Sequence, residues 1–209
     1  MRASRSVVDR YIGIVEAADS ISAWSTVFSS FSKSKTIRSS ASHNYSMFRP
    51  MRRIKQQLSD EETLSVLENG LSGVLALSGD EGYPYAVPLS YVYHNSRLIF
   101  HGALTGHKID AIKNCSKASF CVVEKDEVIP DEYTTYFRSV IAFGKMHILD
   151  REEAREAARI LGAKYRPGFA EELAATVERN LDKMHIFVLD IEHLTGKEAI
   201  ELVRAKKEH

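Results

Sequence analysis

Apolar and polar positions alternate in short runs from residue 73 onward, and most runs are bounded by glycine, proline, asparagine or aspartate. Segment 83–94 alternates with a period of two residues, and segment 134–149 is rich in β-branched and aromatic side chains. Both patterns are typical of half-buried strands. The same reasoning predicts six strands, at residues 73–78, 83–94, 97–100, 118–124, 134–149 and 184–191. Short turns join most of them, so antiparallel pairing is expected.

Helical patterns occur in four places beside these strands. Ser59 and Glu62 form a capping box at the start of the first helix, and Asn69-Gly70 ends it. The last helix carries an apolar stripe that should face the core. The stripe consists of Phe169, Leu173, Val177 and Leu181. The expected helices are residues 59–69, 106–114, 150–161 and 169–181. Because strands dominate and only one short strand-helix-strand passage occurs, the fold is predicted to be mainly β, a small barrel with peripheral α-helices.

Proline and glycine interrupt two of the predicted strands. Pro84 and Pro88 lie in segment 83–94. Since proline has no N–H to donate to a ladder, Pro88 predicts an edge strand or a bulge. Free backbone groups there could meet a ligand, or the proline could protect the edge against aggregation. Gly144 predicts a bulge in segment 134–149, and residues 126–132 read as a polar loop.

Segment 97–114 reads as a strand, a tight turn and a helix. Gly102 and Gly106 bracket the turn, and His107 and Lys108 occupy the first helical turn. Cations there oppose the helix dipole, whereas an anion is favoured by the dipole and by the unpaired N–H groups. The conflict predicts a bound phosphate. The alternative is that Lys108 points into water.

Composition narrows the classes of partner. The formal net charge of the 209 residues is zero, so no extended electrostatic footprint for nucleic acid or an anionic membrane is expected. No apolar run approaches the roughly 18 residues that span a bilayer. Cys115 and Cys121 provide neither a disulfide framework nor a metal-binding spacing, which suits a reducing compartment. None of the eight histidines forms a helical metal-binding pair, so no metal site is expected. A small-molecule partner is favoured.

Residues 1–46 differ from the rest of the chain. They contain 13 serines, six Lys or Arg and three acidic residues, a composition that resembles an organelle transit peptide. They could equally be a disordered tail, or sequence upstream of a start at Met47. The expected folded domain is residues 47–209. The expected location is the cytoplasm, or a mitochondrion or another organelle if residues 1–46 are a transit peptide.

Five motifs, in this order and spacing, resemble the nitroimidazole-resistance (Nim) family of flavoproteins within the pyridoxamine phosphate oxidase-like group. They are GVLALSGDEGYPYAVPLSYVY, LIFHGALTGHKIDAIK, SFCVV, TTYFRSVIAFGK and IEHLTGK, and the resemblance covers roughly residues 50–199. It implies a six-stranded antiparallel split β-barrel that binds FMN, with FAD also possible. It further implies a homodimer with flavin at the subunit interface, and an oxidoreductase that reduces a nitroimidazole or another nitro compound.

The resemblance also implies roles for particular residues. One set would lie along the edge of the isoalloxazine ring: Val87, Pro88, Leu89 and Ser90. A second set would lie beside the ring or hold the phosphate: His101, Gly102, Ala103, His107 and Lys108. A third set would complete the site from this subunit or the other: Arg138, Ser139 and Lys197. Aromatic side chains expected to line the flavin, and to be exposed without a partner subunit, are Tyr85, Tyr91, Tyr136 and Phe137. His101 is the expected catalytic residue, a proton donor to the acceptor.

Two other functions remain open. The protein could be a non-catalytic flavin- or haem-binding module, with His101 or His147 as ligand or lid. It could also be a pyridoxamine phosphate oxidase-like enzyme, although the arginine and histidine cluster that those oxidases carry near the C-terminus is not found in this sequence.

Overall fold

The computed structural model describes residues 48–208, and every structural statement concerns that part of the chain. The predicted extension, residues 1–46, lies outside the described residues. Within them, no helix combines the length and hydrophobicity needed to cross a membrane.

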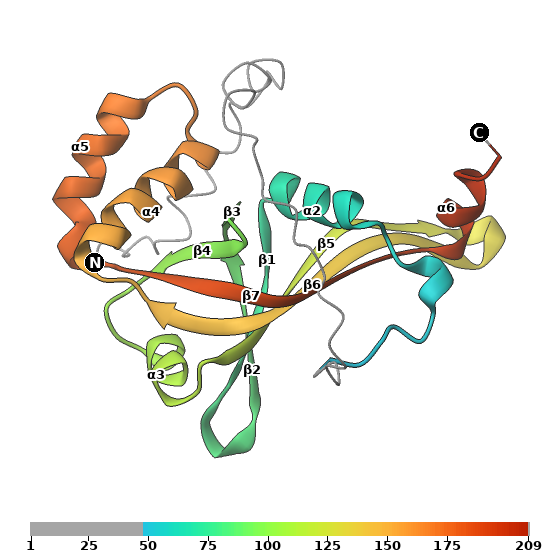
Figure 1. Ribbon diagram of the computed structural model, residues 1–209, viewed down its shortest axis with the longest axis horizontal. Coiled ribbons are helices and arrows are strands. Elements are labelled where there is room, and N and C mark those ends of the chain that lie inside the picture. The colour runs from blue at the N-terminus through green and yellow to red at the C-terminus, as the bar shows by residue number, and fades with distance from the viewer. Residues whose placement is uncertain (1–47, 209) are drawn as a thin grey trace, which may run out of the picture. The chain divides into compact units, whose positions relative to one another are not determined.

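One curled antiparallel sheet organises the molecule (Figure 1). Its strands are β1 Ser72–Ser78, β2 Pro84–Ser90, β3 Val92–His94, β4 Arg97–Gly102, β5 Lys117–Ile129, β6 Thr134–Ile148 and β7 His185–Glu198. Their order is β2-β1-β5-β6-β7-β4-β3, and every pair is antiparallel. The curl forms a half-barrel, which agrees with the predicted mainly β class. The sheet has seven strands where the sequence analysis expected six.

The additional strand arises because the expected strand 83–94 divides at Tyr91. The backbone N–H of Tyr91 donates to the Tyr165 hydroxyl at 2.9 Å, and the Tyr91 carbonyl accepts from the same hydroxyl at 2.8 Å. A distant side chain therefore satisfies the backbone groups that would otherwise continue the ladder. The Tyr91 side chain is fully buried in the core, which corrects its expected exposure beside a ligand.

The helices cover both sides of the sheet. They are α2 Asp60–Asn69, α3 His107–Asn114, α4 Arg151–Tyr165, α5 Ala170–Asn180 and α6 Ile200–Ala205. Short 3-10 turns are η4 Ile54–Gln56, η5 Asp80–Gly82, η6 Pro130–Glu132 and η7 Leu181–Lys183. The predicted capping box is confirmed, since Ser59 and Glu62 satisfy each other's backbone N–H groups at the start of α2. The α4 helix extends four residues beyond its predicted end.

The two faces of the sheet bury different clusters. On the inner face of the curl, α2 and α3 pack against the main core, whose largest side chains include Tyr91, Phe100, Phe120 and Phe187. On the outer face, α4 and α5 cover β4 and the first half of β7 through Ile99, Ile186 and Val188. The remaining outer face, over β1, β5, β6 and the second half of β7, exposes several apolar side chains. These are Val74, Val123, Ile141 and Phe143.

Three strands extend beyond the core as a long arm (Figure 1). β5 continues through the predicted polar loop to Ile129, and β7 continues through Thr195-Gly196-Lys197, so both predicted ends were too early. Polar residues form strands here because β5, β6 and β7 pair along the whole arm. The predicted bulge at Gly144 is confirmed by a register shift between Phe143 and Gly144, where an added Cβ would overlap the Asp190 carbonyl.

The α4–α5 hairpin supplies one further correction. Leu173, Val177 and Leu181 pack in the outer cluster as predicted. Phe169, however, is exposed, and its ring lies 4.3 Å from the guanidinium carbon of Arg166.

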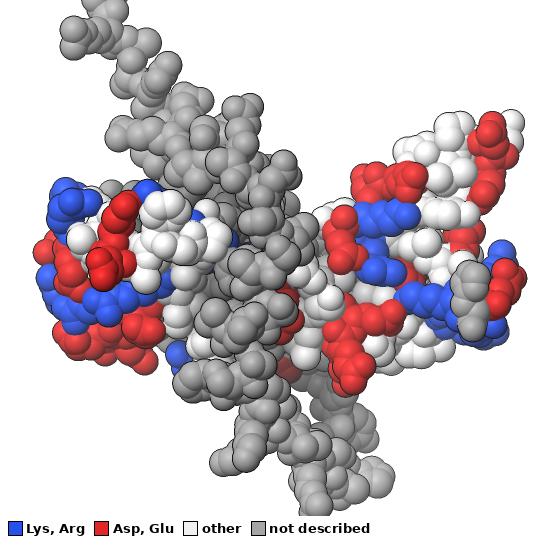
Figure 2. All heavy atoms as spheres, turned by 90° about the horizontal axis from the view of Figure 1, so that it is seen from above, with Lys and Arg blue, Asp and Glu red and all other residues white. Residues whose placement is uncertain are grey.

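On the face shown in Figure 2, basic and acidic side chains interleave in small groups and form no large patch of one sign.

Candidate functional site

The N-terminus of α3 is open. Gly106 precedes the helix with φ +117°, a backbone conformation that favours glycine, and no side chain caps the helix. An added Cβ at Gly106 would meet nothing within 4 Å. Free space and uncapped N–H groups therefore coincide at this point, as an anion site requires.

Lys108 folds back from α3 against the end of β4. Its Nζ lies 5.3 Å from the centre of the Phe187 ring, and an added Cβ on Gly102 would lie 3.2 Å from Nζ. Burial lowers the pKa of Lys108. No carboxylate within residues 48–208 forms an ion pair with it, although most of the arginines described there have one. Lys108 is thus a half-buried cation without a carboxylate partner among residues 48–208.

His107 connects α3 to the turn between β1 and β2. Its ring stacks on Tyr85 with centroids 4.0 Å apart and planes inclined by 15°, and its Nε2 lies 3.6 Å from a carboxylate oxygen of Asp80. Tyr85 is therefore held by a protein partner.

His101 is the penultimate residue of β4, where it pairs with Ile186 of β7. Phe100 points into the inner core, so strand alternation directs His101 to the opposite face. Burial, followed by the charge of Lys108, lowers the pKa of His101. Gly102 ends the strand, and Ala103 is exposed in the loop that follows. Gly102, Gly106, His107 and Lys108 are called the cationic corner below, and His101 lies on the other face of the same strand end.

The predicted ring-edge residues lie on an edge strand, as Pro88 indicated, because β2 pairs only with β1. Val87 and Leu89 pack against the inner core. Pro88 and Ser90 alternate to the outer face, where Pro88 pairs with Val74.

The third predicted set is divided between two faces. Ser139 and Lys197 are cross-strand partners that line a hollow on the outer face. Arg138 points away from it and forms ion pairs with Glu124 at 3.3 Å and with the buried Glu198 at 3.0 Å. Tyr136 donates its hydroxyl to Glu132 on the arm, and Phe137 packs under the ammonium of Lys197.

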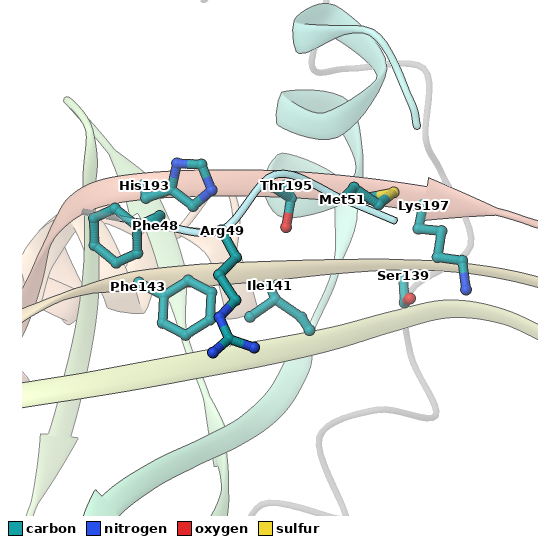
Figure 3. Close-up of a pocket in the computed structure, with 9 residues that line it drawn as sticks. All are labelled: Phe48, Arg49, Met51, Ser139, Ile141, Phe143, His193, Thr195 and Lys197. Carbon is teal, nitrogen blue, oxygen red and sulfur yellow. The ribbon is translucent and has the colours of Figure 1, made fainter. Parts of the chain in front are cut away.

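The outer-face hollow has a volume of about 490 Å³ and was not anticipated as a whole (Figure 3). β6 and β7 form its floor, and the segment preceding η4 forms a wall. Its lining consists of Phe48, Arg49, Met51, Ser139, Ile141, Phe143, His193, Thr195 and Lys197. The period-two alternation of β6 could have revealed Ser139, Ile141 and Phe143 as one face, but no local signal connects residues 48–51 to them.

The cationic corner and the outer-face hollow lie on opposite sides of the sheet. Phe187, below Lys108, belongs to the inner core, whereas Ile141 and Phe143 alternate outward from the buried Val140 and Ala142. Ser139 and Lys197 therefore reach a ligand at the corner only if a second copy presents them.

Other candidate ligands are engaged or dispersed. His147 Nδ1 lies 3.1 Å from a carboxylate oxygen of Asp190. Among residues 48–208, no three His, Cys, Asp or Glu side chains come together as a metal site, and both cysteines are free thiols.

Comparison with known proteins gives a family and a fold. A sequence model of the family described as Pyridoxamine 5'-phosphate oxidase matches residues 59–198. No match was found among curated proteins.

Three solved structures illustrate the likeness in fold. The FAD and haem binding protein of Mycobacterium smegmatis has a TM-score of 0.62 and 24% identity, over 72% of this chain and 80% of that chain. The flavocytochrome Anf3 of Azotobacter vinelandii has a TM-score of 0.63 and 18% identity, over 72% of each chain. A proposed 5-nitroimidazole antibiotic resistance protein of Bacteroides thetaiotaomicron has a TM-score of 0.57 and 20% identity, over 68% of this chain and 86% of that chain.

Proposed function

The chain belongs to the pyridoxamine 5'-phosphate oxidase family, and from that membership we propose that it is a flavin-dependent oxidoreductase of the Nim type. The proposed cofactor is FMN, with FAD as the alternative, and the proposed acceptor is a nitroimidazole or another small nitro compound. The fold relatives named as FAD-binding, as a flavocytochrome and as a proposed nitroimidazole resistance protein support this choice.

The observation that carries the proposal is the half-buried Lys108 beside the uncapped start of α3. A flavin phosphate at the cationic corner would accept from the free helix N–H groups and neutralise Lys108. The residues present fit that group, because Gly106 leaves open space at the helix start and Gly102 lets the Lys108 ammonium approach the end of β4. His107 would border the phosphate from its stack on Tyr85.

The isoalloxazine ring would lie along β2, against the backbone of Val87 to Ser90. One side of an edge strand has backbone groups without a ladder partner, and these can bond a planar heterocycle. Ser139 and Lys197 would close the site from a second copy, because they face the other side of the sheet in their own chain. The proposed assembly is accordingly a homodimer with shared flavin sites.

A bound flavin supplies the electrons, while the protein orients the cofactor and the acceptor. His101 is the proposed proton donor to the acceptor oxygen. Its lowered pKa leaves the imidazole mostly neutral at pH 7, so donation should strengthen as the pH falls.

The first experiment combines an absorption spectrum with turnover. The purified protein should show a flavin spectrum and reduce a nitroaromatic compound, faster at pH 6 than at pH 8. His101→Ala should keep the flavin, lose roughly 10²- to 10⁴-fold in rate and lose the pH dependence. His94→Ala, in the turn between β3 and β4, is the matched control. A flavin-loaded His101→Ala protein that turns over at the parent rate would exclude His101 as the donor.

A second candidate is a non-catalytic flavin- or haem-binding protein. The fold relatives named as a FAD and haem binding protein and as a flavocytochrome support it, with His101 or His147 as the iron ligand through neutral imidazole. The same spectrum discriminates, since a haem-loaded protein shows an intense Soret band that flavin lacks.

A further inference from the structure

The outer-face hollow continues into a second one. A neighbouring hollow of about 400 Å³ is lined by Met51, Arg52, Arg53 and Lys197, so the two share Met51 and Lys197. Together they are called the outer groove. The segment that forms the wall of the groove is attached to β7 by backbone contacts. Gln57 and Lys197 form an antiparallel β-bridge, and the Leu58 N–H donates a hydrogen bond to the Gly196 carbonyl. The groove is therefore held in place by backbone contacts, and within one copy it lies on the opposite face of the sheet from the cationic corner.

The outer groove collects positive charge. Arg49, Arg52, Arg53 and Lys197 line it, and among residues 48–208 no carboxylate does. Within residues 48–208 none of these four forms an ion pair. The Lys197 ammonium lies over the Phe137 ring, 4.9 Å from its centroid. Six other arginines of that part of the chain are paired with Asp or Glu. Guanidinium groups gathered in this way match phosphate oxygens, which they bind in a bidentate manner.

The other end of the groove is aromatic. Phe48 stacks on His193 with centroids 4.6 Å apart and planes inclined by 6°, and Phe143 lies 5.4 Å from Phe48. Phe143 and Ile141 keep exposed surface that faces the hollow (Figure 3). Such a surface accepts a planar base, and the hydroxyls of Ser139 and Thr195 stand beside it to bond a sugar or ring nitrogen.

We propose that the outer groove binds the adenosine diphosphate moiety of a dinucleotide, with the base on Phe143 and the pyrophosphate on Arg52, Arg53 and Lys197. The combined hollows have the size of a small-ligand pocket rather than of a protein interface. A moiety with an aromatic base at one end and two phosphates at the other matches the order of the lining. Its source is either the flavin, as FAD, or a nicotinamide dinucleotide that donates electrons. Only this choice of source rests on the proposed function.

Calorimetric titration of the full-length, FMN-loaded protein with ADP and with adenosine tests the site directly, because FMN has no adenosine diphosphate moiety to fill the groove. ADP should bind at least about tenfold more tightly than adenosine, because only ADP presents charges to the arginines. Arg52→Gln combined with Arg53→Gln should weaken ADP binding by about tenfold or more and leave adenosine binding unchanged. Arg204→Gln combined with Lys207→Gln removes two exposed cations of the C-terminal segment and should change neither.

Two further arms identify the source. If the source is FAD, the Arg52/Arg53 variant loses affinity for FAD but not for FMN. If the source is a nicotinamide dinucleotide, the FMN-loaded variant shows a raised KM for NADH or NADPH with little change in kcat. ADP that shows no saturable binding, or that binds the Arg52/Arg53 variant as it binds the Arg204/Lys207 control, overturns the proposal. If the protein takes up no flavin but still binds ADP, the proposal for the outer groove stands and the proposed flavin-dependent function is rejected.

Discussion

At the scale of single residues, the surroundings of Lys108 favour an anion at the cationic corner. Its half-buried ammonium lies against Gly102 and over Phe187, and no carboxylate in the described part of the chain, residues 48–208, pairs with it. Burial disfavours a charge unless a partner compensates, and here the compensation can come from an anion at the helix start. Arg138, in contrast, has its compensation within the chain, through Glu124 and Glu198. Two cations predicted for one site thus have different electrostatic surroundings.

Lys108→Ala should weaken FMN binding by roughly 10- to 150-fold, the equivalent of about 1.5–3 kcal/mol for a charge-assisted bond. Riboflavin, which lacks the phosphate, should bind the parent and the variant alike. Titration of both ligands by flavin fluorescence measures the two effects. Lys113→Ala, in the last turn of the same helix, is the control and should leave both affinities unchanged. Equal losses for FMN and riboflavin would remove the phosphate from the cationic corner.

At the scale of elements, the division between β2 and β3 depends on α4. The hydroxyl of Tyr165, the last residue of α4, bonds both backbone groups of Tyr91 and also contacts the Leu71 carbonyl. The Tyr91 side chain in turn donates to the Leu67 carbonyl of α2 at 2.8 Å. One side-chain oxygen therefore connects the outer helices to the strand that turns into the inner core.

Tyr165→Phe should lower the free energy of unfolding by about 1–3 kcal/mol, because it leaves the Tyr91 backbone N–H without an acceptor. The ring keeps its packing, so the loss should reflect the hydroxyl alone. Urea denaturation followed by circular dichroism measures it. Tyr133→Phe, at a side chain that is 98% exposed, is the control and should change stability by less than about 0.5 kcal/mol. A Tyr165→Phe protein as stable as that control would show that water replaces the hydroxyl.

At the scale of the whole molecule, the outer face of the sheet exposes apolar side chains over β1, β5 and β6, as an interface with a partner would. Val74, Cys121 and Ile141 are aligned across β1, β5 and β6, and Val123 is 59% exposed beside them. Contiguous apolar surface of this kind marks interfaces more often than free surface. The proposed homodimer would cover Val74, Cys121 and Val123, and it would place the outer groove of one copy, with Ser139 and Lys197, beside the flavin of the other.

Val123→Lys should raise the dissociation constant of the flavin-loaded dimer at least about tenfold, since a charge in an apolar interface loses its hydration. Sedimentation equilibrium of the full chain at micromolar concentration measures it. Phe169→Lys, an equivalent change on the exposed side of the α4–α5 hairpin, is the control and should leave the dimer intact. A flavin-loaded parent protein that sediments only as a monomer would contradict the dimer proposal.

Local features of this protein follow from its sequence alone. The capping box at Ser59, the open helix start at Gly106, the bulge at Gly144 and the edge position of Pro88 are each specified within a few residues. Backbone propensity, capping and the missing N–H of proline act over that range. The mainly β class follows for the same reason, because short periodic runs determine it.

Contacts between distant segments were decided by the tertiary structure. The Tyr165–Tyr91 bond divides a predicted strand, and β7 extends seven residues beyond its predicted end at Ile191. The two faces of β6 separate Arg138 from Ser139. The outer groove likewise joins residues 48–53 to β6 and β7. Such contacts depend on strand register and on the curl of the sheet, which arise from packing of the whole core rather than from neighbours in sequence.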